Sequence, residues 1–313
     1  MAAHPQASVY SRREAVGPSF QASGLCPGIP SPPQPRIPVI DAQPSRSNVT
    51  PLENQEELNN RVWEEGNYVK WYAGHKLRGA ERVILDRYRG DLAGRVLELG
   101  CGGGRVTGHV IPIASSVHGL DISPAMVAHC RAAYPQATFS QGDLRDLGRF
   151  GDGSFEVVLA AMNIIDVLDD PGRRALLDEI HRVLSADGLL IMSSHSLAFV
   201  PSMTKPYAVE THGSMREFAR SILYMPRRVR NHRRLAPLER REAGYAILND
   251  TGLDFALLHY YITPDEQARQ FKQLGFELLE CVDIDGGTLA AGDSGSGCSE
   301  LHYVARRGVP ESV

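Results

Sequence analysis

Between residues 95 and 196, short apolar runs alternate with stretches whose apolar residues recur at helical spacing. The apolar runs cover residues 96–99, 117–120, 137–139, 157–160 and 189–192. Two amphipathic stretches lie between them, at residues 126–133 and 173–184, and Ser123 with Pro124 provides a helix start for the first. Strand and helix alternating at this length predict a parallel sheet whose strands are joined by crossover helices.

A similar pattern returns near the C-terminus. The segment Thr263-Pro264-Asp265-Glu266 places an N-cap residue, a proline and a glutamate as a capping box does, so it predicts a helix, which ends at Gly275. Strand-like runs follow at residues 276–282 and 301–304, and we expect them to close the sheet. Residues 197–255 interrupt the alternation, and we expect a helical cap inserted between core segments 95–196 and 256–307.

The N-terminal segment differs from the rest of the chain. Nine of the 20 prolines fall within residues 1–50, and proline fixes φ and removes a backbone donor, so we expect a disordered tail. The alternative is a tail that folds over the site when a ligand binds. From Thr50 the sequence Thr50-Pro51-Leu52-Glu53 repeats the capping pattern, so we expect residues 51–94 to form an N-terminal helical lid.

Composition excludes several classes of protein. No stretch of the 313 residues approaches the ~18 to 20 consecutive apolar residues that cross a bilayer, and a secretory signal is missing, so we expect a cytoplasmic location without membrane contact. The five cysteines lack CxxC pairing and no HxH or HExxH pattern occurs, so we expect neither disulfides nor a metal site. The net charge of -4 gives no global attraction to nucleic acid, so we expect a small-molecule partner.

The inserted segment is rich in arginine. Its arginines include Arg227, Arg228, Arg230, Arg233 and Arg234, mixed with apolar residues. Three interpretations stay open: a solvated face of the cap, a site for a carboxylate or phosphate of the substrate, or a contact with RNA. The absence of a longer basic stripe with interleaved aromatic residues argues against RNA.

The most informative motif is a glycine-rich turn at the end of the first predicted strand. Its sequence is Val96-Leu97-Glu98-Leu99-Gly100-Cys101-Gly102-Gly103-Gly104-Arg105. Glycines after an apolar strand allow a ligand to approach the backbone closely. The dinucleotide fingerprint GxGxxG is missed, because its third glycine position falls on Arg105, and no Gly-Lys-Ser/Thr of a Walker loop follows. What fits is an acid, one spacer and Gly-x-Gly-x-Gly.

In this form, residues 98–104 resemble the first motif of the class I S-adenosylmethionine-dependent methyltransferases. Asp121 ends the second predicted strand, where the family's acid binds the two ribose hydroxyls. Asp143 ends the third, where the family's acid accepts a hydrogen bond from the adenine amino group. Residues 155–163 resemble the fourth strand, which leads into the active site. Independently of the family, a carboxylate at the carboxyl end of a strand lies in the crevice where open α/β sheets bind ligands.

The resemblance covers about residues 63–306 and implies an α/β fold of the Rossmann-like, doubly wound type. This fold has a seven-stranded, mostly parallel sheet with an antiparallel last strand. The implied cofactor is S-adenosyl-L-methionine. The residues assigned to the cofactor are Tyr68, Glu98, Gly100, Gly102, Gly104, Asp121, Ile122, Met126, Asp143, Leu144 and Asn163.

Two residues are candidates for a role in the reaction. His195 follows the fifth predicted strand at the crevice and is a candidate base for an acceptor that must lose a proton; the alternative is a histidine merely hydrogen-bonded beneath the cap. Tyr72, with Tyr68 and Trp71, precedes the first motif, where related enzymes often place a lid, and aromatic faces attract a sulfonium cation; core packing is the alternative. The segment His259-Tyr260-Tyr261 lines the acceptor pocket or packs as a strand.

These observations favour a methyltransferase that acts on a small metabolite as a monomer or homodimer. Methyl transfer from a sulfonium depends mainly on holding the nucleophile in line in a dry pocket. One alternative is an enzyme of the same fold that cyclises the aminobutyryl chain of S-adenosylmethionine and releases methylthioadenosine. Another is a non-catalytic protein that uses the cofactor pocket for regulation. The acceptor atom is not determined by the sequence.

Overall fold

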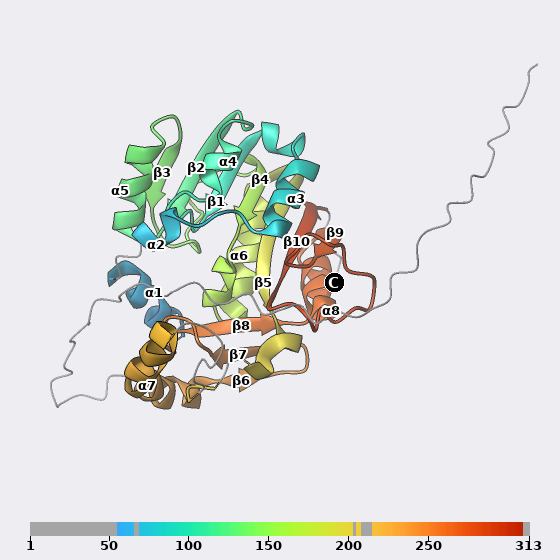
Figure 1. Cartoon of the computed structure of the whole chain (residues 1–313). Coiled ribbons are helices and arrows are strands. Elements are labelled where there is room, and N and C mark those ends of the chain that lie inside the picture. Colours follow the sequence, from blue (N-terminus) through green and yellow to red (C-terminus); the bar gives the residue numbers. More distant parts are fainter. Residues whose placement is uncertain (1–54, 66–68, 203–204, 208–214, 309–313) are drawn as a thin grey trace, which may run out of the picture.

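The computed structural model describes residues 55–65, 69–202, 205–207 and 215–308. Within these ranges a central sheet carries helices on both of its faces (Figure 1). The proline-rich tail, the capping pattern at Thr50 and the candidate Tyr68 lie outside the described residues, so the predictions for them remain predictions.

Ten strands form one sheet within the described residues. Their order is β3-β2-β1-β4-β5-β8-β7-β6, while β10 pairs with β5 and β9 pairs with β10. The bounds are β1 Arg95–Leu99, β2 Ser116–Asp121, β3 Thr138–Gln141, β4 Phe155–Ala160, β5 Leu184–Ser196, β6 Arg240–Arg241, β7 Tyr245–Asn249, β8 Leu258–Ile262, β9 Phe276–Val282 and β10 Glu300–Arg307. Strands β1 to β5 are parallel, and β10 is antiparallel to β5 and β9. The seven predicted strands and the antiparallel last strand are confirmed.

The helices pack on the sheet in two layers (Figure 1). Their bounds are α1 Gln55–Glu65, α2 Val69–Ala73, α3 Gly79–Arg87, α4 Thr107–Val110, α5 Pro124–Ala133, α6 Asp170–Val183, α7 Met215–Leu235 and α8 Pro264–Gln273, with short 3-10 helices η1 Asp91–Ala93, η2 Ile164–Val167, η3 Leu197–Ser202 and η4 Ala236–Leu238. The capping prediction at Thr263 is confirmed, because its side chain accepts a hydrogen bond from the backbone N–H of Glu266.

Neighbouring residues of β1 belong to different cores. Val96 of β1 packs into the cluster that contains Ile84 of α3 and Val110 of α4, whereas Leu97 packs into the cluster that contains Leu176 of α6 and Phe271 of α8. Because helices cover both faces, four successive residues are buried in β1 and in β4, which agrees with the short apolar runs of these strands in the sequence. The parallel strands therefore end together at one edge, where a ligand site is expected.

The insertion contains more than the expected helical cap. In addition to α7, it supplies β6 and β7, and β8 follows directly after it. These three strands extend the sheet beyond the seven that were predicted. Strand β8 pairs with the last two residues of β5 through His195 with Tyr261 and Ser196 with Ile262. The segment His259-Tyr260-Tyr261 is thus part of a strand, and β8 continues the sheet past the end of β5.

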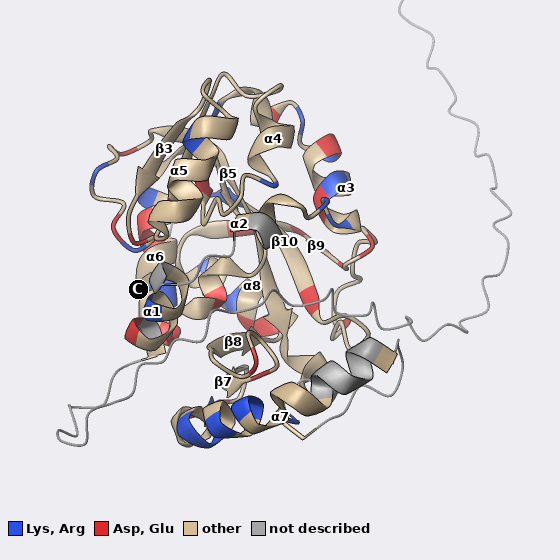
Figure 2. Ribbon diagram, turned by 60° about the vertical axis from the view of Figure 1, so that its left-hand side comes forward, with Lys and Arg blue, Asp and Glu red and all other residues tan. Residues whose placement is uncertain are grey.

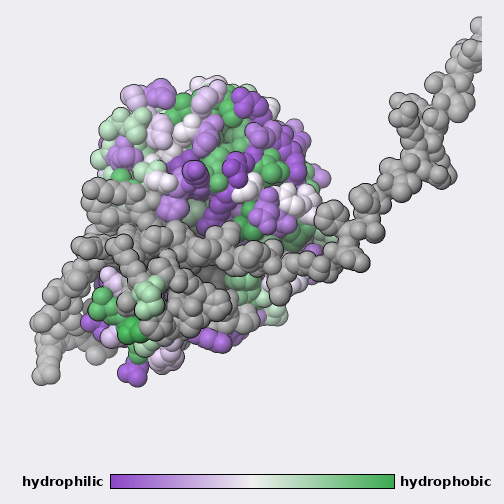
Figure 3. All heavy atoms as spheres, in the orientation of Figure 1, coloured by the Kyte–Doolittle hydropathy of each residue, from purple (hydrophilic) through white to green (hydrophobic). Residues whose placement is uncertain are grey.

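Helix α7 carries many of the arginines of the insertion (Figure 2). Arg230, Arg233 and Arg234 are exposed, whereas the guanidinium of Arg228 lies 5.3 Å from the ring centroid of Phe255. This arrangement is that of a solvated helix face with one packed arginine. On the face shown in Figure 3, hydrophilic and hydrophobic side chains are interspersed over the part of the molecule that carries α3 and α4.

Candidate active site

The glycine loop after β1 is built on left-handed backbone. Gly100, Gly102 and Gly104 have φ values of 63°, 52° and 79°. A Cβ on Gly100 would lie 2.4 Å from the side chain of Ile164, and one on Gly104 would lie 2.3 Å from the ring of Tyr134. At Gly102 the nearest atom to such a Cβ is a backbone oxygen at 3.9 Å. The loop is therefore packed tightly at both ends and has free space at Gly102, where a ligand could approach the backbone.

Asp121 at the end of β2 faces this loop. One carboxylate oxygen accepts the backbone N–H of Gly102 at 2.8 Å, and the other accepts the backbone N–H of Ser123 at 2.9 Å. Burial raises the pKa of Asp121, and these two hydrogen bonds oppose the increase. Within the described part of the chain, the hydroxyl oxygen of Ser123 is buried without a hydrogen-bond partner. The predicted ribose-binding acid and the most open point of the glycine loop are thus held together.

Asp143 lies after β3 and already has partners from the protein. Its carboxylate pairs with Arg145 at 2.6 Å and accepts a hydrogen bond from the side chain of Asn60, on α1, at 3.2 Å. Burial raises the pKa of Asp143, but the hydrogen bonds and charge of Arg145 together with the bond from Asn60 lower it below its usual value. The following Leu144 is partly buried against the main core. Asp143 therefore joins the lid helix to the strand edge.

Asn163 forms a sharp turn after β4. It has a φ of 56°, and its backbone N–H donates to the hydroxyl of Ser193 at 2.8 Å. Its side-chain amide donates to Glu300 at 3.1 Å, while its Oδ1 atom is buried and has no hydrogen-bond partner among the residues that the structure describes. The left-handed turn directs the chain from β4 into η2, whose Ile164 packs on Gly100. Asn163 thus stands between the glycine loop and the end of β5.

Two further predicted residues lie under the lid. Met126 of α5 is buried in a cluster that includes Trp63 of α1 and Tyr72 of α2. The rings of Trp63 and Tyr72 meet edge to face, with 5.8 Å between their centroids. The backbone carbonyl of Ile122 accepts a hydrogen bond from Gln141 at 3.2 Å. Tyr72 therefore packs against Trp63 of the lid and against α5, the helix that follows Asp121.

Glu98, the acid of the first motif, is buried. It accepts a hydrogen bond from the hydroxyl of Thr107 on α4. Burial raises the pKa of Glu98 to about 7, although the hydrogen bond from Thr107 and the charge of Arg105 act in the opposite direction. The Glu98 carboxyl group is therefore costly to ionise in the folded protein.

This raised pKa predicts how stability changes with pH. Because the folded-state pKa of Glu98 is about 7 against an ordinary 4.5, its contribution to stability is complete below 4.5 and is lost as the pH rises through 7. We expect the Glu98→Gln variant, which stays neutral, to gain up to about 3 kcal/mol in unfolding free energy relative to the natural protein between pH 5 and 8. Urea unfolding at several pH values measures this difference. A difference that does not change with pH would contradict the prediction.

His195 lies at the end of β5 and is held by Asp166. Its Nδ1 atom is 2.8 Å from the carboxylate of Asp166, which also accepts the backbone N–H of His195 at 2.7 Å. Asp166 is on η2 and is fully buried, and its other oxygen bonds Arg173 at 2.5 Å and the hydroxyl of Ser194 at 2.7 Å. Burial lowers the pKa of His195, but the hydrogen bond and charge of Asp166, with further charges, raise it above its usual value. A carboxylate that holds a histidine in this way fixes its ring orientation.

A second histidine is stacked on the first. His259 of β8 bonds the carboxylate of Asp250 through Nδ1 at 2.8 Å, and the hydroxyl of Tyr261 donates to the same carboxylate. Although burial raises the pKa of Asp250, the charge and hydrogen bond of His259 bring it below its usual range. One ligand atom each from His195, Asp250 and His259 lie within 4.8 Å of one another, a spacing that a metal ion could share. The sequence predicted no metal site because these residues are far apart along the chain.

The structure brings the predicted residues into two adjoining groups. The glycine loop, Glu98 and Asp121 form the first, and Asn163 and His195 form the second, with η2 between them. Asn59 of α1 covers this junction, because its side-chain amide donates to the carbonyls of Val167 at 2.8 Å and Leu258 at 2.7 Å. Sequence analysis missed Asp166 and Asp250. Asp166 could have been found as an acid just after the fourth strand, whereas no local pattern marks Asp250.

Comparisons with known proteins find methyltransferases among the proteins similar to this chain. A family model described as a methyltransferase domain matches residues 96–188. A probable S-adenosylmethionine-dependent methyltransferase of Mycolicibacterium smegmatis is 34% identical over 45% of this chain and 51% of its own length, so the chain spans about half of that relative. A trans-aconitate 2-methyltransferase of an Enterobacter species is 30% identical over 61% of this chain and 68% of its own length.

A solved structure shares the fold. The 1,6-didemethyltoxoflavin-N1-methyltransferase of Burkholderia thailandensis matches with a TM-score of 0.51 and 15% identity, and the match covers 87% of this chain and 99% of the other. This likeness concerns the fold, in which the sheet and its covering helices correspond. Among the helices of the described residues, none combines the length and the apolar character that a membrane span needs.

Proposed function

The chain belongs to the class I S-adenosylmethionine-dependent methyltransferases, and we propose that it transfers a methyl group in line from S-adenosyl-L-methionine to a small metabolite. The observation that carries this proposal is the contact between Asp121 and Gly102. It joins an acid that can accept hydrogen bonds from a diol to the one glycine of the loop that leaves space beside its backbone.

The residues present fit this cofactor. Two buried oxygens, the hydroxyl of Ser123 and Oδ1 of Asn163, lack hydrogen-bond partners among the described residues and flank the glycine loop, so they can bond a polar ligand there. We propose that Asp121 and Ile122 hold the ribose, and that Asp143 and Leu144 hold the adenine. The other residues of the proposed cofactor site are Tyr68, Glu98, Gly100, Gly102, Gly104, Met126 and Asn163. Asp143 already accepts three hydrogen bonds from Arg145 and one from Asn60, so in this proposal the adenine amino group replaces one of these donors.

When bound, the cofactor supplies a methyl group on a sulfonium, whose C–S electron pair returns to sulfur as the acceptor atom bonds to the methyl carbon. The role of His195 in the proposed reaction is to take the proton that a hydroxyl or amine acceptor must lose. Asp166 holds Nδ1, so Nε2 is the atom that receives this proton. Tyr72 supports the lid over the sulfonium, where an aromatic ring attracts a cation.

The setting of this activity is also a proposal. We expect a small-molecule acceptor rather than nucleic acid, and a cytoplasmic protein that works as a monomer or homodimer. The described cysteines, Cys101, Cys130, Cys281 and Cys298, are free thiols, which supports a reducing compartment. The exposed arginines of α7 support an interpretation as a solvated face of the insertion.

Calorimetric titration with S-adenosylmethionine and with S-adenosylhomocysteine tests the proposal. We expect micromolar binding of both, and S-adenosylhomocysteine as the nucleoside released when a panel of hydroxyl and amine acceptors is added. Mass spectrometry identifies the nucleoside. Methylthioadenosine as the product would show that the enzyme catalyses cyclisation and not methyl transfer. Failure of both ligands to bind would overturn the proposed cofactor site.

Substitution of Asp121 tests the position of the ribose. We expect Asp121→Ala to weaken binding of S-adenosylhomocysteine by about 5- to 150-fold, because the variant loses a charge-assisted bidentate contact worth about 1 to 3 kcal/mol. Asp146→Ala is the matched control, since Asp146 follows β3 but its side chain is 68% exposed and makes a 3.6 Å pair with Arg149. Equal affinities of the two variants for S-adenosylhomocysteine would show that Asp121 does not contact the cofactor.

A further inference from the structure

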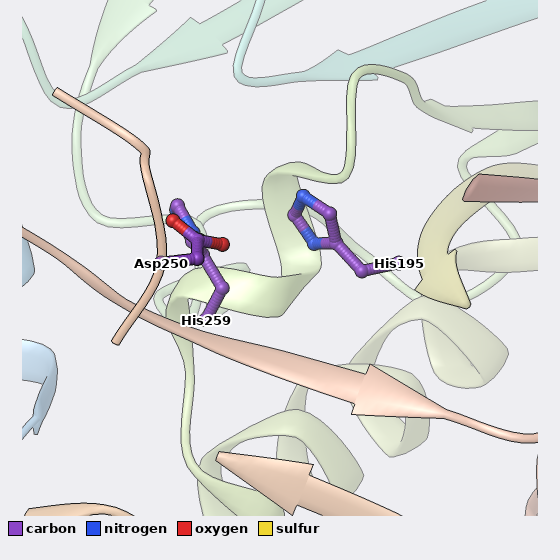
Figure 4. A group of neighbouring side chains, drawn as sticks. All are labelled: His195, Asp250 and His259. Carbon is purple, nitrogen blue, oxygen red and sulfur yellow. The ribbon is translucent and has the colours of Figure 1, made fainter. Parts of the chain in front are cut away.

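Two aspartate–histidine pairs meet where β5 and β8 lie side by side. Asp166 holds His195, and Asp250 holds His259, each through Nδ1 at 2.8 Å. The two imidazole rings are stacked, with centroids 5.0 Å apart and planes inclined by 30°. Figure 4 shows Asp250 and His259 on one side of this space and His195 on the other. The histidine side chains are 14% and 10% exposed, whereas the carboxylates are buried, so only the rings can be reached by a ligand.

The hydrogen bonds fix what the rings offer to that ligand. A carboxylate only accepts hydrogen bonds, so Nδ1 of each histidine is the donor. In a neutral imidazole, Nε2 then carries a lone pair and no proton. Within the described part of the chain, no protein group bonds Nε2 of His195 or of His259. When both rings are neutral, as a base requires of His195, they present two hydrogen-bond acceptors on stacked rings whose centroids are 5.0 Å apart.

The charges around the rings are predominantly negative. Three buried carboxylates, those of Asp166, Asp250 and Glu300, act on His195. Arg173 pairs with Asp166, and Arg78 pairs with Glu300. The side-chain and backbone groups that bond Asp250 are His259, Tyr261 and the N–H of Gly252. No arginine or lysine of the described residues bonds Asp250, so with neutral imidazoles one buried negative charge stays without a counter-ion.

This inference rests on the proposed methyltransferase function. We infer that His195 and His259 together form the acceptor site, and that its substrates are neutral or cationic molecules that present hydroxyl or amine donors, not carboxylates. Hydroxyl and amine donors match the two lone pairs, and a cationic amine also balances the charge of Asp250. An ionised carboxylate offers no donor and adds negative charge beside three buried carboxylates, so the site discriminates against it.

The two histidines have different tasks in this site. The proton of the reacting hydroxyl or ammonium group moves to Nε2 of His195, while the Nδ1–H of His195 keeps its hydrogen bond to Asp166. The lone pair left on the acceptor atom would form the bond to the methyl carbon as the methyl–sulfur bond breaks and its electron pair returns to sulfur. His195 later releases the proton to solvent. His259, fixed by Asp250, accepts a hydrogen bond from a second donor of the same molecule and so orients the reacting atom.

The test compares two probes on the full chain loaded with S-adenosylhomocysteine. Catechol carries two adjacent hydroxyls, and trans-aconitate, the substrate in the name of one relative, carries carboxylates. Titrations are followed by NMR on protein labelled with carbon-13 at histidine Cε1. We expect catechol to shift the signals of His195 and His259, and to bind at least about tenfold more tightly than trans-aconitate. Equal or tighter binding of trans-aconitate, or its methylation, would overturn the inference.

Variants separate the acceptor site from the cofactor site. His259→Gln and Asp250→Asn are expected to weaken catechol binding by about fivefold or more and to leave the affinity for S-adenosylhomocysteine unchanged. His118→Gln is the control, because His118 of β2 bonds Ser140 at 2.9 Å and lies outside the site. Unchanged catechol affinity in both variants would refute a role for His259. If the natural protein itself does not bind S-adenosylhomocysteine, the proposed function is contradicted instead.

A metal ion is the competing occupant of this cluster. Both oxygens of Asp250 already accept hydrogen bonds, which favours an acceptor site over a metal centre. Zinc is therefore titrated against the natural protein and His259→Gln after treatment with a chelator. We expect no zinc binding tighter than millimolar. Micromolar zinc binding that is lost in His259→Gln would show a metal site and would overturn the inference.

Discussion

Replacing His195 with glutamine is expected to lower kcat by about 10²- to 10⁴-fold with a hydroxyl or amine acceptor. The affinity for S-adenosylmethionine should change by less than about twofold, since the lost interaction concerns the transition state. Glutamine can still hydrogen-bond Asp166, which is 2.8 Å from Nδ1 of the natural residue, but it cannot take a proton. Initial rates with the acceptor found in the panel, together with calorimetry of the cofactor, measure the two quantities.

The pH profile distinguishes a base from a structural histidine. The base must be neutral, and the interactions of His195 with Asp166 raise the pKa of the histidine above its ordinary 6.5. The rate should therefore rise with pH through a value above 6.5, and this rising limb should vanish in His195→Gln. His118→Gln should keep both the rate and the limb. Full turnover in His195→Gln would show that the histidine is a bystander.

The cofactor half of the site could be predicted because its residues lie in short, continuous segments of the sequence. Each acid stands immediately after an apolar run, so the end of a strand, the turn and the functional residue are read together. A parallel sheet then brings separate strand ends to one edge without further information. The contact between Gly102 and Asp121 is the direct result, because β1 and β2 are neighbours in register.

The acceptor half depends on contacts between distant parts of the chain. His195 meets His259 only because β8 pairs with the last two residues of β5. The sequence analysis expected a helical insertion before residue 256 and therefore did not predict this pairing. Strands β7 and β8 are buried almost throughout, so their residues lack the polar alternation that marks a half-exposed strand. Asp250 lies after β7 and bonds His259 across a turn. No spacing rule predicts this contact from the sequence.

Replacing Arg173 with methionine is expected to have the largest effect on stability. The Arg173 side chain has no exposed surface, and it bonds Asp166 at 2.5 Å and Gln267 at 2.5 Å while its guanidinium lies 4.7 Å from the ring centroid of Tyr260. Methionine fills similar volume but removes the guanidinium that pairs with the buried carboxylate of Asp166, which keeps only His195 and the hydroxyl of Ser194 as side-chain partners among the described residues. We expect a loss of about 3 to 5 kcal/mol in unfolding free energy, seen in urea titrations.

The neighbouring Arg174 provides the matched control. It pairs with Asp170 at 2.9 Å on the same helix, but its side chain is 27% exposed, so Arg174→Met should cost less than about 1 kcal/mol. If the uncompensated charge is the cause, adding Asp166→Asn to Arg173→Met should restore part of the lost stability, because the buried group is then neutral. An additive double variant would assign the loss to packing of Arg173 instead. Since Asp166 also holds His195, partial recovery of stability without recovery of turnover would show that one buried ion pair supports both the fold and the proposed base.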